Sequence, residues 1–249
     1  MTVHFIGAGP GAADLITVRA QRIISASSVC LYAGSLVPAE LLEYCPAGAQ
    51  VVDTARLSLD EITALLVAAD SAGHDVARLH SGDPSIFSAV AEQTRRLDAA
   101  GVRYGMVPGV PAFTAAAAAL GRELTVPGVS QTIVLTRVST LSTAMPEGED
   151  LRSLGRSGST MVIHLGAHRI EQIADELAEN YGIDCPVAVV AFASRPDEIV
   201  VRGTLSSIVR QVHGAGITKT AVVIVGRVLT AEGFPDSYLY SAARERVTH

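Results

Sequence analysis

The stretch that decides the fold of this chain is Ser81-Gly82-Asp83-Pro84-Ser85-Ile86-Phe87. An alternating run at 76–80 before it predicts a strand, and apolar residues over 89–100 after it recur at helical spacing. Gly82 can adopt backbone angles that are closed to other residues. Asp83 is a good helix N-cap and Pro84 fits the first helical position, so we expect a helix to begin here. In open α/β sheets ligands bind outside the carboxyl ends of strands, so Asp83 is a candidate binding residue as well as a cap.

Two more Gly/Pro-rich loops follow predicted strands in the first half of the chain. Gly7-Ala8-Gly9-Pro10-Gly11 follows a strand at 3–6, and Pro108-Gly109-Val110-Pro111 follows a strand at 102–107. None of the three loops carries a nucleophile or an obvious general base. Such loops line a pocket with backbone and suit a neutral or cationic ligand. We therefore expect a site that positions a reactive cofactor rather than one that does acid–base chemistry.

Composition limits the class of protein. The chain has 249 residues, of which 49% are hydrophobic, enough for two modest domains or one large one. Apolar runs fall short of the ~20 residues of a membrane helix and the N-terminus lacks a basic lead, so we expect a soluble, cytoplasmic protein without a membrane partner. The net charge of −6 and the lack of Trp argue against nucleic acid. The three cysteines show neither disulfide nor metal-ligand spacing.

Strand and helix signals alternate along both halves of the chain. In the first half, Ser58-Leu59-Asp60-Glu61 is a capping box that starts a helix. An earlier helix follows residues 14–17 and is expected to turn Val18 and Ile24 inward. Residues 121–128 carry a Pro and two Gly and indicate the domain boundary.

The second half predicts a mixed sheet. Its expected strands are 132–137, 160–165, 187–192 and 221–225, with 198–202 as an antiparallel neighbour of the third. The polar segment 138–159 is expected to be a long surface excursion, either a binding loop or a disordered one.

Three other interpretations depend on local patterns. Gly7-x-Gly9-x-x-Ala12 matches a loose dinucleotide fingerprint, which would indicate an NAD(P)-dependent oxidoreductase. Against it, Pro10 removes a backbone donor, and the strand at 29–32 is not followed by the acidic residue that grips a ribose. His164 and His168 have the spacing of a helical metal pair, but a Gly between them breaks the helix, so we expect no metal. A non-catalytic ligand sensor stays open because no catalytic side chain is visible.

Several stretches, in order, resemble the tetrapyrrole methyltransferases, which use S-adenosylmethionine on corrin and porphyrin precursors. They are 5–11 with 14–17, then 82–87, then 107–110 with the alanine-rich segment 112–120, and finally 223–228. The similarity spreads over nearly the whole chain. Within this family, the loop 32–38 is similar to the branch that methylates C11 of precorrin-4 or of its cobalt-containing counterpart. Methylation of precorrin-3B at C17 or of uroporphyrinogen III is the alternative.

The resemblance implies the architecture and the cofactor site. It implies a class III methyltransferase fold of two α/β domains, 1–121 with a mostly parallel sheet and 122–249 with a mixed sheet, with the active site in the cleft between them. It also implies a homodimer that binds S-adenosylmethionine and releases S-adenosylhomocysteine. Carried over residue by residue, it assigns the cofactor to Pro10, Gly82, Asp83, Ile86, Pro111, Ala112, Leu165 and Ala193.

We choose the candidate substrate-binding residues by their charge. A precorrin-type tetrapyrrole carries many carboxylates, and arginine forms forked hydrogen bonds with carboxylates. The candidates are Arg56, Arg122 and Arg137. No residue is assigned as a general acid or base.

Overall fold

A computed structural model describes residues 1–139 and 144–237 of the chain. Residues 140–143, which belong to the expected excursion at 138–159, lie outside the described residues. The chain divides into two compact units, Met1–Ala115 with Ser194–Pro196, and Ala116–Ala193 with Asp197–His249. The division falls inside helix α4 (Ala112–Leu120), shortly before the connection at 121–128. No described helix is both long and apolar enough to cross a membrane.

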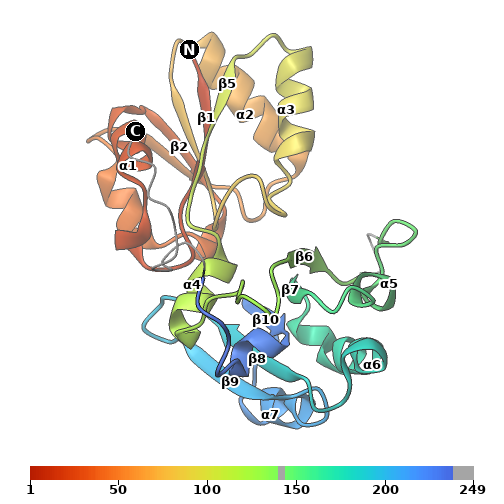
Figure 1. The fold of residues 1–249 in the computed structure, drawn as a ribbon. Helices are drawn as coiled ribbons and strands as arrows, with labels where there is room; N and C mark the ends of the chain where they lie inside the picture. The colour runs from red at the N-terminus through yellow and green to blue at the C-terminus, as the bar shows by residue number, and fades with distance from the viewer. Residues whose placement is uncertain (140–143, 238–249) are drawn as a thin grey trace, which may run out of the picture. The chain divides into compact units, whose positions relative to one another are not determined.

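The first unit is a five-stranded parallel sheet with helices on both faces (Figure 1). Its strand order is β3-β2-β4-β1-β5. The elements are β1 (Val3–Gly7), α1 (Val18–Ala26), β2 (Val29–Tyr32), β3 (Gln50–Asp53), α2 (Leu59–Ser71), β4 (Val76–His80), α3 (Val90–Ala99) and β5 (Tyr104–Val107), with short 3-10 turns at Ala13–Leu15, Gly34–Leu36 and Ala39–Tyr44.

Alternation along the strands gives the first unit two cores. Phe5 and Leu31 pack with α2 and α3 on one face, whereas Ile6 and Leu79 pack with α1 on the other. The capping box of α2 is confirmed, since the Ser58 hydroxyl accepts from the Glu61 N–H and the Glu61 carboxylate accepts from the Ser58 N–H. Because all the strands run parallel, their carboxyl ends lie at one edge of the sheet.

Two local predictions in this unit are wrong. Val18 is 61% exposed, because Thr17 caps α1 and sets a helix phase in which Ala20 and Ile24 are buried. The helix expected at Asp83 and Pro84 begins at Val90 instead. Residues 81–89 form a turn-rich segment, which turns back through left-handed backbone, with a φ of 50° at both Phe87 and Ala89.

The second unit is built on a mixed five-stranded sheet, as the sequence predicts. The order is β6-β7-β10-β8-β9, with β6 and β7 parallel and the other pairs antiparallel. Its elements are β6 (Ile133–Arg137), α5 (Leu151–Gly155), β7 (Thr160–His164), α6 (Ile170–Tyr181), β8 (Pro186–Ala191), β9 (Ile199–Thr204), α7 (Ile208–Gly214) and β10 (Ala221–Val225), with 3-10 turns at Ala167–Arg169 and Arg227–Thr230.

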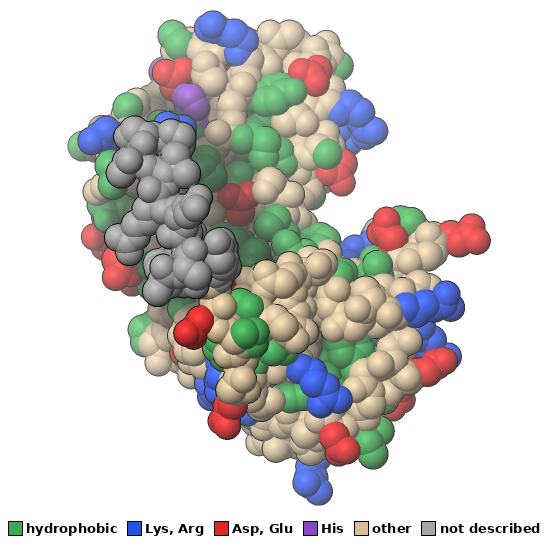
Figure 2. All heavy atoms as spheres, in the orientation of Figure 1, with side chains coloured by type: hydrophobic (Ala, Val, Ile, Leu, Met, Phe, Trp, Pro, Cys, Tyr) green, Lys and Arg blue, Asp and Glu red, His purple; other side chains and the backbone are tan. Residues whose placement is uncertain are grey.

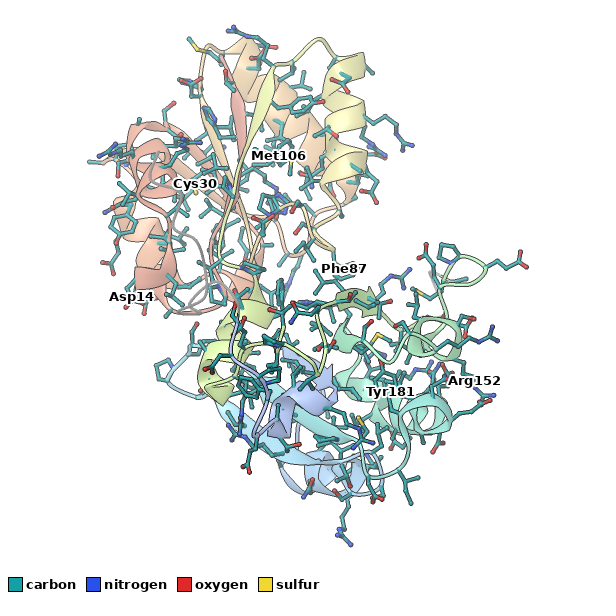
Figure 3. The ribbon with its side chains drawn as sticks, in the orientation of Figure 1. Asp14, Cys30, Phe87, Met106, Arg152 and Tyr181 are labelled. Atoms are coloured by element: carbon teal, nitrogen blue, oxygen red, sulfur yellow. The ribbon has the colours of Figure 1, made fainter. Side chains whose placement is uncertain are left out.

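Two residues labelled in Figure 3, Tyr181 and Arg152, take part in hydrogen bonds within this unit. The Tyr181 hydroxyl at the end of α6 donates to the Ser159 carbonyl at 2.5 Å, and burial is the main reason that the pKa of Tyr181 rises to about 12. The Arg152 carbonyl on α5 accepts from the Asn180 side chain at 2.9 Å. α5 and α6 therefore pack as a pair on the face that also buries Ile163 and Val189.

Three glycines let the ends of β1, β4 and β5 touch through their backbones. A Cβ on Gly7 would lie 2.5 Å from Gly109 Cα and 2.7 Å from the Gly82 carbonyl oxygen. A Cβ on Gly109 would lie 2.3 Å from that same oxygen. Real Cβ atoms do not approach main-chain atoms so closely, so only glycine fits at either position. The atoms that a Cβ would meet at Gly7 or Gly109 all belong to the main chain, so no flexible side chain can move aside to make room for it.

We expect Gly109→Ala to lower the free energy of unfolding by about 3 kcal/mol, at the upper end of overpacking effects, because backbone must separate to admit the methyl group. Gly105→Ala is the matched control, since Gly105 lies in β5, the strand that leads to Gly109, and a Cβ there meets nothing within 4 Å. Urea unfolding of both variants measures the difference. Equal stability of the two would show that the three-glycine contact can relax.

Candidate functional site

The predicted cofactor residues of the first unit come together at one edge of its sheet. β4, β1 and β5 are adjacent and parallel, so the loops after them meet. Gly9 and Gly82 form an isolated bridge, with the Gly82 N–H donating to the Gly9 carbonyl at 2.7 Å. A Cβ on Gly82 would lie 3.7 Å from Pro111 Cα and 3.8 Å from the Ala112 nitrogen. Thus Pro10, Gly82, Asp83, Ile86, Pro111 and Ala112 lie on three loops that contact one another.

Asp83 links two of these loops. One carboxylate oxygen accepts from the Ser85 N–H at 2.8 Å and from the Ser85 hydroxyl, and the other accepts from the Gly109 N–H at 2.9 Å. Partial burial alone would raise the pKa of Asp83, but the hydrogen bonds from Ser85 and Gly109 outweigh it, so the pKa is lowered. Asp83 is therefore ionised at neutral pH and ties residues 81–89 to the loop after β5. The tether replaces the helix cap that the sequence predicts.

The charge of the three loops suits a cationic ligand. Residues 7–11, 82–87 and 108–112 contain no Lys, Arg or His, and Asp83 is their one charged side chain. The sulfonium of S-adenosylmethionine is positively charged, and an ionised carboxylate among neutral backbone is compatible with it. The residues present thus fit the cofactor that the resemblance implies.

A segment following β8 contributes to the same unit. The Ser194 hydroxyl accepts from the Ala12 N–H at 2.9 Å, which satisfies a donor at the end of the loop after β1. The sequence alone does not indicate this contact, because the two residues are 182 positions apart.

Strained backbone gathers at one edge of the second sheet. Leu165 after β7, Phe192 after β8 and Thr220 before β10 have φ values of 54°, 52° and 52°. Left-handed backbone is costly for such residues and concentrates at functional sites. Leu165, a predicted cofactor residue, is 59% exposed, whereas the predicted Ala193 is buried beside Phe192.

The three predicted substrate arginines lie in different surroundings. Arg56, in the loop after β3, is exposed, and within the described ranges its side chain makes no hydrogen bond or ion pair. Arg122 donates to the Ala231 carbonyl at 3.4 Å, and Arg137 donates to the Val138 and Ala144 carbonyls at 3.1 and 3.3 Å. Basic and acidic side chains are interspersed over the face shown in Figure 2. The structure leaves Arg56 with the most freedom to meet a carboxylate.

The structure also shows buried polar residues that the sequence analysis missed. Arg78 and His80 are 4% and 6% exposed, at alternate positions of β4 on the face that packs against α2 and α3. Burial, and then the charge of Arg78, lowers the pKa of His80 to about 3, so this imidazole is neutral. Its Nε2 atom has no hydrogen-bond partner among the described residues. The sequence does carry one signal for this pair, which is a charged residue, Arg78, at an inward-facing position of an otherwise apolar strand.

Comparisons with known proteins identify the family of this chain. The family model for tetrapyrrole (corrin/porphyrin) methylases matches residues 2–209, and the chain belongs to that family. A precorrin-4 C(11)-methyltransferase of Rhodococcus erythropolis is 84% identical over 249 residues, 100% of both chains.

Solved structures of relatives share the fold. A cobalt-precorrin-4 methyltransferase, described as a cobalamin biosynthetic enzyme, has a TM-score of 0.89 and 36% identity, covering 92% of this chain and 96% of its own. The uroporphyrin-III C-methyltransferase of Thermus thermophilus, solved with S-adenosylhomocysteine, has a TM-score of 0.77 and 29% identity, covering 92% and 99%. The two-sheet fold described above is thus that of the family.

The depressed pKa of His80 makes stability depend on pH. Unfolding exposes the imidazole, which then binds a proton below its ordinary pKa of 6.5, whereas the folded state stays neutral down to about 3. Between about pH 7 and pH 5 this group alone should lower the free energy of unfolding by about 2 kcal/mol. We expect His80→Asn to remove that part of the pH dependence in urea unfolding. His168→Asn, at an exposed position, should leave it unchanged.

Proposed function

We propose that this protein is an S-adenosylmethionine-dependent C-methyltransferase of cobalamin biosynthesis that methylates C11 of precorrin-4 to give precorrin-5. The observation that carries the proposal is the 84% identity, over full length, to a precorrin-4 C(11)-methyltransferase. Relatives named for the cobalt-containing substrate are 45% and 36% identical. This difference favours the cobalt-free ring as the substrate.

The chain's own residues would hold the cofactor mainly through backbone and small side chains. S-adenosylmethionine supplies an activated methyl group when it is bound. The loops after β1, β4 and β5, with Pro10, Gly82, Asp83, Ile86, Pro111 and Ala112, would form one wall for it. Leu165 and Ala193, which the resemblance also assigns to the cofactor, are part of the same proposal.

The protein's contribution to catalysis is placement. The acceptor ring carbon is made nucleophilic by its conjugated nitrogens, so the chain need not supply a strong base. Holding the carbon, the methyl group and the sulfur in line can remove roughly 7–11 kcal/mol of barrier through effective molarity. The rigid three-glycine contact and the Asp83 tether are suited to this task. Arg56, and with it Arg122 and Arg137, would meet the carboxylates of the ring.

The proposal also includes the location and the oligomeric state of the enzyme. We place the enzyme in the cytoplasm, as its composition and N-terminus lead us to expect, and as a homodimer, as the family resemblance implies. Light scattering on the purified protein measures the oligomeric state, and a monomer at micromolar concentration would contradict this part.

Binding and turnover test the function. S-adenosylhomocysteine at a hundred times its dissociation constant should stabilise the fold by about 2.7 kcal/mol and raise the melting temperature by a few degrees, whereas NAD(H) and NADP(H) should not. Incubation with precorrin-4 and S-adenosylmethionine should then add the mass of one methyl group, placed at C11 by NMR. A shift with a dinucleotide alone, or methylation at another carbon, would sink the proposal.

We expect Asp83→Asn to weaken S-adenosylhomocysteine binding at least tenfold by calorimetry. An amide has one acceptor oxygen, so it cannot serve the N–H groups of both Ser85 and Gly109, and the two loops lose their link. Asp14→Asn, at an exposed site in the loop after β1, should change affinity less than twofold. Lowered stability with unchanged affinity in Asp83→Asn would reduce this residue to a purely structural tether.

A further inference from the structure

Arg78 is a buried cation without a counter-ion. It lies in the middle of β4 at 4% exposure, and no Asp or Glu forms an ion pair with it in the described part of the chain. Its guanidinium instead donates from Nη1 to the Thr54 hydroxyl at 2.8 Å and from Nε to the Gln93 amide oxygen at 3.3 Å. Burial lowers the pKa of Arg78 to about 10, so the group is still charged at neutral pH.

Each of the two side chains that accept a hydrogen bond from Arg78 also donates one to a backbone carbonyl. The Thr54 hydroxyl donates to the Tyr32 carbonyl at 2.9 Å, at the end of β2. The Gln93 amide donates from Nε2 to the Ala89 carbonyl at 3.0 Å, just before α3. Four hydrogen bonds thus run from Tyr32 through Thr54, Arg78 and Gln93 to Ala89. We call this series the Arg78 relay.

The two ends of the relay lie at the ends of two loops. Tyr32 precedes residues 33–38, the loop that marks the C11-methylating branch, and Ala89 closes the segment 81–89 that holds Asp83. Ala89 has a φ of 50°, and α3 has no side-chain N-cap. Left-handed backbone at an alanine persists only where its surroundings hold it. The Gln93 side chain donates to the Ala89 carbonyl and accepts from Arg78, so it links that peptide to β4.

Stability alone does not account for an arginine here. Well-packed apolar residues often replace buried charged networks at no loss of stability, whereas a planar guanidinium fixes two partners in set directions. A charge in this position also lowers the pKa of His80, two residues further along the same strand face. What the arginine adds is therefore defined geometry at both ends of the relay.

We propose that Arg78 is a positioning residue of the methyl transfer, which acts through Thr54 and Gln93 to fix the loops 33–38 and 81–89 without touching either ligand. The proposal rests on the proposed function, because that function assigns the loop 81–89 to the cofactor. The proposal itself places the loop 33–38 beside the methyl acceptor, since its sequence is similar to that of the C11-methylating branch. It adds a role for the buried network that the cofactor and substrate residues do not include.

Gln93→Glu separates positioning from stability. The carboxylate keeps the acceptor for Arg78 and gives that cation a counter-ion, but it has no N–H for the Ala89 carbonyl. We expect an unchanged or higher melting temperature together with at least tenfold faster amide exchange in 81–89. S-adenosylhomocysteine affinity and kcat/KM on precorrin-4 should each fall at least tenfold. Gln50→Glu, an exposed position on β3, makes the same charge change and should alter none of these.

The outcomes are distinct from those of the proposed function. If the wild type neither binds S-adenosylhomocysteine nor methylates precorrin-4, the proposed function fails, and amide exchange in 81–89 still reports on the relay. Unchanged exchange and affinity in Gln93→Glu would overturn the relay. Arg78→Lys should retain part of the wild-type affinity and Arg78→Met little of it. If Arg78→Met binds S-adenosylhomocysteine as tightly as wild type, Arg78 has no positioning role.

Discussion

Backbone-to-backbone contact among Gly7, Gly82 and Gly109 is the constraint on which the first unit depends. It brings the ends of β1, β4 and β5 closer than any side chain permits, so the loops beyond them have main chain on their inner surface. The same contact brings Asp83 near the Gly109 N–H, and the resulting tether removes the freedom of residues 81–89. A ligand at this edge meets a surface formed before it arrives, which lowers the entropy lost on binding.

Local sequence predicted most of the secondary structure but not the role of Asp83. The capping box at Ser58 is read correctly because both of its members lie within one turn. Asp83 followed by Pro84 is equally typical of a helix start and of a turn, and the deciding partner, Gly109, is 26 residues away. β3 escaped notice because four residues, mostly exposed, give no clear alternation. Local patterns cannot supply information that resides in distant partners.

The same difference between local patterns and distant partners applies to the candidate site. Gly/Pro-rich loops after apolar strands could be read from the sequence, because strand ends of a parallel sheet share an edge. Arg78 could not, since its meaning comes from Thr54 and Gln93, 24 and 15 residues away. The hydrogen bond from the Ala12 N–H to the Ser194 hydroxyl joins residues 182 positions apart, so no local sequence pattern indicates it. The family resemblance implies the cofactor, whereas the hydrogen bonds of the Arg78 relay can be found only in the structure.

The return of Ser194–Pro196 to the first unit has a consequence for how this protein can be divided. A cut in the connection after α4 yields a leading fragment whose Ala12 N–H has lost its acceptor and a trailing fragment that carries three residues belonging elsewhere. The first unit is therefore completed by residues that the chain supplies only after most of the second unit, so a gene split at that point would leave the loop after β1 without this hydrogen bond.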